Sequence, residues 1–207
     1  MRATGVFIAM AVVSSLSVKG QAQTDSLTAG TGENIIWYFD IGLGPNTRGA
    51  NFDLSFTLSS ANVMGGNINF RAGYVTMKDI PSDYYEGFMR KLAPASDFID
   101  LSLNLTLKFS GSEKHFRFGF ETGPSFLWYD KVELVLNPRY PDLFEYKYNK
   151  IRTVHNTIGF HCAMKFEIPA LDHLGCSFIL FGNINNVQSL FGLDVCISLG
   201  KVRKKSA

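Results

Sequence analysis

Ten charged side chains lie within otherwise apolar stretches of the chain, where they could conduct protons or ions or cross-link a protein interior. Six are acidic and four are basic: Asp40, Asp53, Arg71, Asp100, Lys108, Arg117, Glu121, Lys165, Glu167 and Asp194. An unpaired buried charge is costly, so charges of both signs on one enclosed surface are expected to pair. We interpret these residues as a structural network of ion pairs, and a proton or ion path is the functional alternative.

The residue types used in catalysis and metal binding show no recognisable spacing. The histidines lack HxxxH and HExxH patterns, and no GxSxG or phosphate-binding loop is present. Cys162, Cys176 and Cys196 match neither a disulfide framework nor a zinc site, although one disulfide stays open as an alternative. A hydrolase that pairs Ser125 with His155 is the enzymatic alternative. We predict that the chain is not an enzyme and needs no cofactor.

Apolar and polar residues alternate along the segments that carry the ten charges, which predicts strands with two different faces. Eight such segments cover residues 37–44, 51–59, 68–74, 99–109, 116–123, 158–167, 176–185 and 192–200. The pattern is weakest over 176–185, where Ile179 and Phe181 fall at polar positions. Eight is an even number, and about 10 residues per strand is the length that a tilted transmembrane strand needs.

Two features predict that the apolar rows face lipid and the polar rows face a narrow bore. The polar rows are rich in Ser, Thr and Gly, which fit the small interior of an eight-stranded barrel. Aromatic residues such as Trp37 and Trp128 lie near the expected strand ends, like the girdles of outer-membrane barrels. The predicted fold is therefore all-β: an eight-stranded antiparallel up-and-down transmembrane β-barrel. A soluble periplasmic lipid-binding barrel, with its apolar rows inside, is the alternative.

The N-terminus has the features of a secretory signal peptide over residues 1–22. Arg2 precedes an apolar run from Val6 to Val18, and small residues near Ala22 suit cleavage there. We expect a short periplasmic segment over 23–33, the barrel over 34–200 and a basic tail over 201–207. Without the signal peptide the chain has equal numbers of acidic and basic residues, so its charge gives no indication of nucleic-acid binding.

The connections between the segments alternate between the two sides of the membrane, and the two longest fall on the same side. With the N-terminus in the periplasm, residues 60–66, 110–114 and 169–175 form the periplasmic connections, and 45–49, 78–96, 130–150 and 186–189 the outer ones. Short periplasmic turns and longer outer loops are typical of outer-membrane barrels. Alternation also continues through 130–150, on both sides of a turn at Asn137–Asp142. This predicts a hairpin that protrudes beyond the membrane, with a ten-stranded barrel as the competitor.

The outer loop 78–96 contains a cluster of aromatic and basic residues. Tyr84, Tyr85, Phe88 and Arg90 could form a recognition patch, because aromatic residues and Arg are enriched at interfaces. A capping box at Asp83 and Glu86 suggests a short surface helix through these residues. The alternative is that the cluster packs over the rim of the barrel.

Three stretches give the chain its resemblance to a known family: the processing site at Gln21–Gln23, the segment Glu121–Pro124 and the final segment Gly192–Gly200. They are similar to the bacterial outer-membrane β-barrel domain family that includes porin-T-like proteins, over essentially the whole mature chain. The resemblance implies insertion into the Gram-negative outer membrane by the barrel-assembly machinery, without implying one activity. One departure is that such chains often end in an aromatic residue, whereas this one continues through Lys201–Ala207.

These observations lead to one functional hypothesis with two alternatives. We expect a narrow, plugged barrel in contact with outer-membrane lipid that acts as a scaffold or interaction protein. Its outer loops would contact another envelope protein, for example as an accessory of secretion or envelope assembly. The alternatives are a small-solute pore and the soluble lipid-binding barrel.

Overall fold

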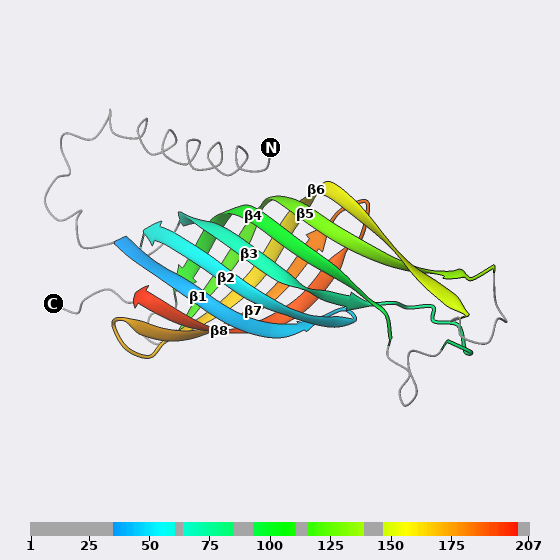
Figure 1. Cartoon of the computed structure of the whole chain (residues 1–207). Helices are drawn as coiled ribbons and strands as arrows, with labels where there is room; N and C mark the ends of the chain where they lie inside the picture. The colour runs from blue at the N-terminus through cyan, green and yellow to red at the C-terminus, as the bar shows by residue number, and fades with distance from the viewer. Residues whose placement is uncertain (1–34, 61–63, 85–92, 111–115, 139–146, 203–207) are drawn as a thin grey trace, which may run out of the picture. The chain divides into compact units, whose positions relative to one another are not determined.

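Eight antiparallel strands form a closed barrel in the computed structural model, which describes residues 35–60, 64–84, 93–110, 116–138 and 147–202 (Figure 1). The strands are β1 (Ile35–Asn46), β2 (Gly49–Ser60), β3 (Met64–Thr76), β4 (Ala95–Ser110), β5 (Arg117–Leu136), β6 (Tyr148–Pro169), β7 (Leu174–Ile184) and β8 (Leu190–Lys201). Each strand pairs with the next, and β8 pairs with β1. The predicted up-and-down topology is confirmed. The predicted signal peptide and the segment 23–33 lie outside the described residues.

The stagger of the strands sets the width of the barrel. The pairing can be followed once around the barrel, from β1 back to β1. Each residue in this series pairs with the next, one per strand: Ile36, Ser59, Gly65, Thr106, Glu121, Ala163, Phe181, Gly192 and finally Asn46. One circuit therefore ends ten residues further along β1 than it began. Such a stagger tilts the strands, and a tilted eight-stranded barrel has an interior that side chains can fill.

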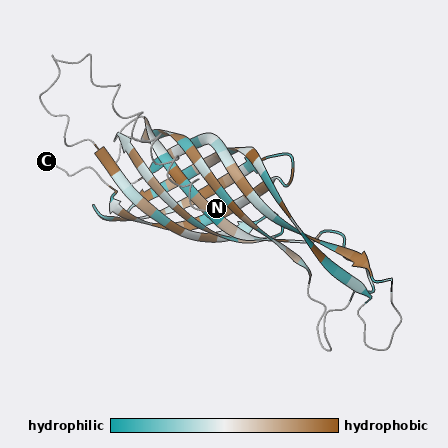
Figure 2. Cartoon of the chain, turned by 45° about the horizontal axis from the view of Figure 1, so that its top comes forward, coloured by the Kyte–Doolittle hydropathy of each residue, from teal (hydrophilic) through white to brown (hydrophobic). Residues whose placement is uncertain are grey.

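Hydrophobic and hydrophilic residues alternate along the strands (Figure 2), and their two faces point as this alternation predicts. Apolar side chains such as Leu43 (67% exposed) and Phe109 (58%) lie on the outer surface of the barrel. Polar side chains such as Asp40, Asp53 and Arg71 point inward and are fully buried. A lipid-binding barrel requires the opposite arrangement, with its apolar rows around an internal cavity.

Part of the interior is apolar, which explains the weak alternation of β7. Ile179 and Phe181 point into the lumen and are 2% exposed. They belong to an internal apolar layer with Val75, Phe98, Leu127, Tyr129, Ala163, Leu190 and Cys196. Where this layer includes residues of β7, both the inward and the outward side chains of the strand are apolar. The alternation of apolar and polar residues therefore disappears from the sequence.

Strands β5 and β6 extend far beyond the rest of the barrel (Figure 1). Their pairing continues to Leu136 and Tyr148, whereas β4 accompanies β5 only as far as Asp130. On the other side, β7 accompanies β6 only from Phe160 onward. The predicted protruding hairpin is confirmed, and the ten-stranded alternative is wrong.

The ends of the barrel differ in their connections. β1 begins beside the end of β8, as the pairing of Trp37 with Lys201 shows, so the start of the first strand and the end of the last strand lie at one end of the barrel, which we call the terminal end. The two longest connections, 77–94 and 137–147, are both at the opposite end, the distal end. This is the asymmetry that the sequence predicts. None of the described residues forms a helix of the length and apolarity needed to cross a membrane.

Candidate functional site

The lumen brings together side chains from all eight strands because every second residue of a strand points inward. Neighbouring strands place charges directly beside each other: Arg71 on β3 pairs with Asp53 on β2 and with Asp100 on β4. Charges that are distant in sequence then meet across the narrow bore. The lumenal charges form two groups, which we call the Lys165 cluster and the Arg71 cluster.

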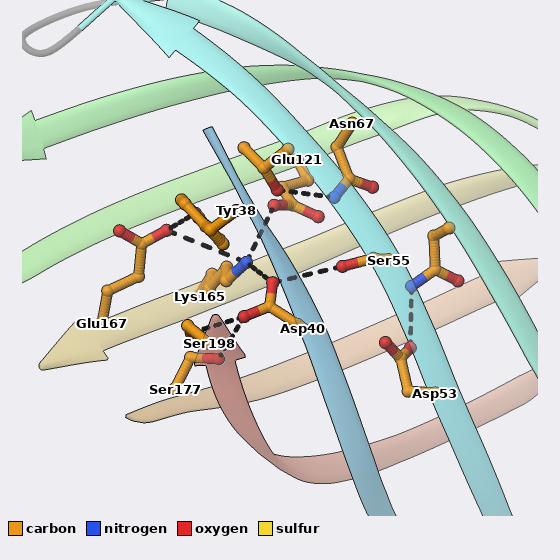
Figure 3. A network of polar contacts seen from close by, with 12 residues as sticks. Tyr38, Asp40, Asp53, Ser55, Asn67, Glu121, Lys165, Glu167, Ser177 and Ser198 are labelled. Carbon is orange, nitrogen blue, oxygen red and sulfur yellow. Dashed lines mark hydrogen bonds and ion pairs between the residues drawn. The ribbon is translucent and has the colours of Figure 1, made fainter. Parts of the chain in front are cut away.

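Lys165 is the centre of the first cluster (Figure 3). Its ammonium group forms an ion pair with Asp40 on the facing strand β1, and its Nζ lies 3.9 Å from Glu121 Oε1 and 3.8 Å from Glu167 Oε1. Asp40 also accepts hydrogen bonds from three hydroxyl groups, those of Ser55 (3.2 Å), Ser177 (3.4 Å) and Ser198 (2.5 Å). Lys165 and Asp40 are fully buried, so this pair connects opposite walls of the barrel without solvent contact.

Glu167 extends the Lys165 cluster toward the terminal end. Its carboxylate lies 3.2 Å from Lys108 Nζ and 3.0 Å from Arg117 Nε, and it accepts a hydrogen bond from the Tyr38 hydroxyl. Lys108 Nζ in turn donates to Tyr38 Oη over 2.8 Å. With Lys165, three cations and a phenol therefore surround this carboxylate, which satisfies a charge that would be costly to bury alone.

Val202, which directly follows β8, is buried at the terminal side of this cluster. Arg117 Nη2 donates a hydrogen bond of 2.6 Å to the carbonyl oxygen of Val202. Val202 is buried with Ile36 and Tyr38, after Gly200 turns the backbone with a φ of +138°. A positive φ of this kind favours glycine. Val202 thus turns inward after β8 instead of continuing the strand.

The Arg71 cluster is the second group of lumenal charges. Arg71 Nη2 lies 2.6 Å from Asp53 Oδ2 and 2.9 Å from Asp194 Oδ2, so one guanidinium joins β2, β3 and β8. The guanidinium carbon lies 3.5 Å from the centroid of the Phe181 ring, a cation–π contact. Side-chain amides donate further hydrogen bonds to the two carboxylates: Asn69 donates to Asp53 over 2.7 Å, and Asn51 donates to Asp194 over 2.6 Å.

All ten charged residues predicted for the lumen face it. Nine of them lie within 4 Å of an opposite charge, and Asp100 is paired in register with Arg71, whose ion pairs go to Asp53 and Asp194. Sequence reasoning did not single out the uncharged members of the clusters. These are Tyr38, Asn51, Ser55, Asn69, Ser177, Phe181 and Ser198. Their only signal in the sequence is that they share the polar row with the charges.

The other candidate residues are dispersed. The Ser125 hydroxyl accepts a hydrogen bond from Asn183, and His155 pairs with Tyr129, four residues along β5 from Ser125. At about 3.3 Å per residue this separates the two by roughly 13 Å, so no Ser–His pair forms. The three cysteines are free thiols, and the described residues include no group of three or more metal-binding side chains.

The predicted loop patch is described in part. Tyr84 is 3% exposed and lies against Tyr148 of the hairpin, with ring centroids 6.2 Å apart. Tyr84 therefore packs the loop onto the hairpin and is not available at the surface. Tyr85, Phe88 and Arg90, together with most of the predicted helix, lie outside the described residues.

Ion pairs attach the hairpin to the barrel rim and to the loop after β3. Arg152 on β6 lies 3.1 Å from Asp97 and 2.6 Å from Asp130, which joins β6 to β4 and β5. Asp83 in the loop pairs with Lys147 and accepts a 2.9 Å hydrogen bond from the Tyr148 hydroxyl. The hydrogen bonds from Lys147 and Tyr148 lower the pKa of the Asp83 carboxyl below its ordinary value, and the bond from Lys147 has the larger effect.

Comparison with solved structures supports the same fold. The chain is similar to the N-terminal β-barrel domain of OprF from Pseudomonas aeruginosa, with a TM-score of 0.51, 7% identity, and coverage of 81% of this chain and 97% of that one. The Yersinia pestis attachment invasion locus protein Ail and neisserial surface protein A both give a TM-score of 0.45 at 8% identity. Each match covers 80% of this chain. The match covers 95% of the Ail chain and 96% of the chain of neisserial surface protein A. No protein-family model and no curated protein sequence matches the chain. The likeness to the OprF domain confirms an eight-stranded barrel of the outer-membrane type.

Proposed function

We propose that this protein is an integral outer-membrane barrel with a closed bore that acts as a membrane-anchored interaction platform. Its distal end, with the two long connections and the β5–β6 hairpin, is the part that binds another envelope protein. An accessory role in secretion or envelope assembly, after insertion by the barrel-assembly machinery, is the form of this function that we favour. The observation that carries the proposal is a lumen filled with buried, mutually paired charges.

The lumen supports a closed bore because buried side chains occupy it along its length. Val202, Ile36 and Tyr38 lie at the terminal end, and the Lys165 cluster, the Arg71 cluster and the internal apolar layer occupy the lumen beyond them. Arg71 and Lys165 are joined to carboxylates on other strands, so neither side chain can move aside without leaving a buried charge unpaired. A pore would need a continuous hydrated path past all of these groups.

The outer surface supports a membrane location. Large apolar side chains cover the outside of every strand, and exposed aromatic residues lie at both ends of the covered zone, with Trp37 near the terminal end and Trp128 near the distal end. A soluble protein rarely exposes a contiguous apolar surface of this size. Such a surface, bordered by aromatic residues, matches the hydrocarbon zone of an outer membrane.

Membrane fractionation combined with gel mobility tests the location and the fold. We expect the full chain in the outer-membrane fraction, released only by detergent, and migrating faster on a gel before heating than after heating. Recovery without detergent would support a soluble barrel and overturn the proposal.

Single-channel recording in planar bilayers tests the closed bore. We expect no conductance steps for the purified full chain. As a comparison, Asp40→Ala combined with Lys165→Ala removes the central ion pair but leaves the Arg71 cluster and the internal apolar layer in place, so this variant is also expected to show no conductance steps. Conductance steps in the unmodified protein would favour the small-solute pore.

A further inference from the structure

The charges inside the barrel do not balance. Six of the ten lumenal charged residues are acidic and four are basic, and all ten are buried. The Lys165 cluster has three of each sign: Asp40, Glu121 and Glu167 with Lys108, Arg117 and Lys165. The Arg71 cluster has one base and three acids, which are Asp53, Asp194 and Asp100. The excess of two negative charges therefore belongs to the Arg71 cluster.

Asp100 is the acidic residue of this cluster that has no cation of its own. It is fully buried, and its register partner Arg71 gives its ion pairs to Asp53 and Asp194. Among the described residues no basic nitrogen lies within 4 Å of the Asp100 carboxyl group, and neither of its oxygens has a hydrogen bond of ordinary geometry. An ionised carboxylate in this position would be a buried charge without compensation, which is strongly unfavourable.

The other ionisable groups near Asp100 do not supply the missing charge. Arg71 on β3 and Asp53 on β2 are the two charged groups that act on it, and Asp53 has the same sign as an ionised Asp100. Asp194 on β8 shares the guanidinium of Arg71 and adds a further negative charge. His161 on β6 is buried near Arg71 and forms no ion pair within the described part of the lumen.

The remaining neighbours of Asp100 are uncharged. Leu127, its register partner on β5, and Phe98, two residues before it on β4, both belong to the internal apolar layer. The side chain of Asn183 on β7 also lies near Asp100, but its amide donates to the Ser125 hydroxyl over 2.9 Å. Asp100 thus lies where the polar and apolar parts of the lumen meet, a place that favours a neutral side chain.

A proton fits this position better than a metal ion. The described residues contain no group of three or more metal-binding side chains, and Arg71 already occupies the space between Asp53 and Asp194. A proton needs only one carboxyl group, and it removes the charge without adding a heavy atom to a filled interior. Carboxylic acids that stay neutral in apolar protein sites are known from enzymes.

We propose that Asp100 is a proton-binding site, so that in the folded barrel at neutral pH it is a neutral carboxylic acid. Its carboxylate takes one proton from solvent as the strands close and releases it when unfolding returns the side chain to water. Loss of this proton from the folded barrel leaves a buried charge unpaired and weakens the interior. The inference goes beyond the proposed interaction function and does not depend on any partner of the distal end.

Infrared spectroscopy of the purified full chain in lipid vesicles tests the protonation state directly. A protonated carboxyl group has a carbonyl stretch that the ionised form lacks. We expect such a band at pH 7, and we expect it to disappear in Asp100→Asn. Asp97→Asn is the matched control on β4, because Asp97 is exposed and paired with Arg152, and this variant should keep the band. Carbon-13 labelling of aspartate carboxyl groups should shift the band in the unmodified chain, so the test does not rely on a variant that folds.

The dependence of stability on pH provides a second test. The folded chain holds a proton that the unfolded chain has released above about pH 4, so the stability due to Asp100 falls as the pH rises. Relative to Asp100→Asn, which imitates the neutral acid, the folding equilibrium constant of the unmodified chain should fall by up to about tenfold per pH unit between about pH 5 and 7. Urea unfolding in vesicles at several pH values measures this constant, and Asp97→Asn should follow the unmodified chain.

Two outcomes would overturn the inference. The first is the absence of an aspartate acid band at pH 7 together with parallel pH profiles for the unmodified chain and Asp100→Asn. The second is a stability that rises with calcium or sodium concentration in the unmodified chain but not in Asp100→Asn, which would assign the missing positive charge to a metal ion. Both outcomes leave the outer-membrane location and any binding at the distal end unaffected, so they are distinguishable from failure of the proposed function.

Discussion

Arg71 illustrates how single residues hold the interior of this barrel together. Its guanidinium makes ion pairs with Asp53 and Asp194 and lies on the Phe181 ring. A buried cation is stable only when its charge and its donors are satisfied, and here three strands provide the partners. The same side chain therefore blocks the bore and fixes the register of distant strands.

Replacing Arg71 should destabilise the barrel more than replacing an exposed lysine. Arg71→Met leaves Asp53 and Asp194 buried without a cation, which should lower the free energy of unfolding by about 3–5 kcal/mol. Urea unfolding in lipid vesicles, followed by tryptophan fluorescence, measures the change. Lys131→Met is the matched control, because Lys131 and Glu133 form an exposed pair that solvent screens and that should contribute little to stability.

A triple variant separates charge from packing at this site. Arg71→Met combined with Asp53→Asn and Asp194→Asn removes the stranded negative charges, so part of the lost stability should return. If Arg71→Met alone were no more destabilising than Lys131→Met, the ion pairs of the Arg71 cluster would not be holding the strands together.

At the residue scale the sequence could predict which side chains enter the lumen but not which of them meet. The two-residue period assigns Asp40 and Lys165 to the inner row without any knowledge of the fold. Their contact depends on the stagger that brings β1 opposite β6, which is a property of the whole ring. The same period places Tyr38 in the inner row, but its contacts with Glu167 and Lys108 on distant strands could not be read from the sequence.

At the scale of elements, β5 shows how local chemistry permits close approach of strands. Pairing with β4 is interrupted between Ser125 and Thr122, where Pro124 provides no backbone N–H for a ladder. At the adjacent Gly123, a Cβ atom would lie only 1.9 Å from the carbonyl oxygen of Leu103. A backbone atom cannot move aside as a flexible side chain can, so only glycine fits.

Gly123→Ala should therefore weaken the barrel. The added methyl group forces the β4 backbone away, at a cost of about 1–3 kcal/mol. Gly119→Ala is a matched control on the same strand, since its Cβ would lie 3.7 Å from its nearest neighbour, an ordinary contact. The temperature at which the fast-migrating gel form disappears should fall for Gly123→Ala and stay nearly constant for Gly119→Ala. Equal behaviour would contradict the close approach.

The loop after β3 and the hairpin form a second contact between elements that should depend on pH. The lowered pKa of Asp83 means that its pairing with Lys147 and Tyr148 contributes above the ordinary pKa of 3.8 and is lost as the pH falls through the depressed value. Carbon NMR titration of the Asp83 carboxyl should show the depression. Lys147→Met should raise the pKa more than Tyr148→Phe, because the lysine makes the larger contribution. Titration of the unmodified chain at 3.8 would rule out this contact in solution.

The strands themselves were well predicted where one face differs from the other. β2 and β4 have polar inner rows and apolar outer rows, so their period is clear. β7 was the weakest because Ile179 and Phe181 are apolar residues in the lumen. Alternation cannot distinguish an apolar residue that faces lipid from one that faces an internal apolar layer.

At the scale of the whole molecule, the number of strands was predictable and the width was not. Turn signals and segment length give eight strands, and connection lengths give the asymmetry between the two ends. The ten-residue stagger depends on cross-strand contacts between residues such as Asp53 and Arg71, which only the closed ring specifies. This stagger sets the tilt and makes the bore narrow enough for the two clusters to fill.

The pairing of Trp37 with Lys201 places the first and last strands side by side, which allows a circularly permuted chain. A short glycine–serine linker from Lys201 to Ile35, with new ends in the turn 170–173, would keep every strand pair. We expect it to reach the heat-modifiable form, whereas opening the chain within β4, between Leu103 and Asn104, should prevent it. If the first permutant also fails to reach the heat-modifiable form, then folding of this barrel depends on the order of the strands along the chain as well as on their pairing.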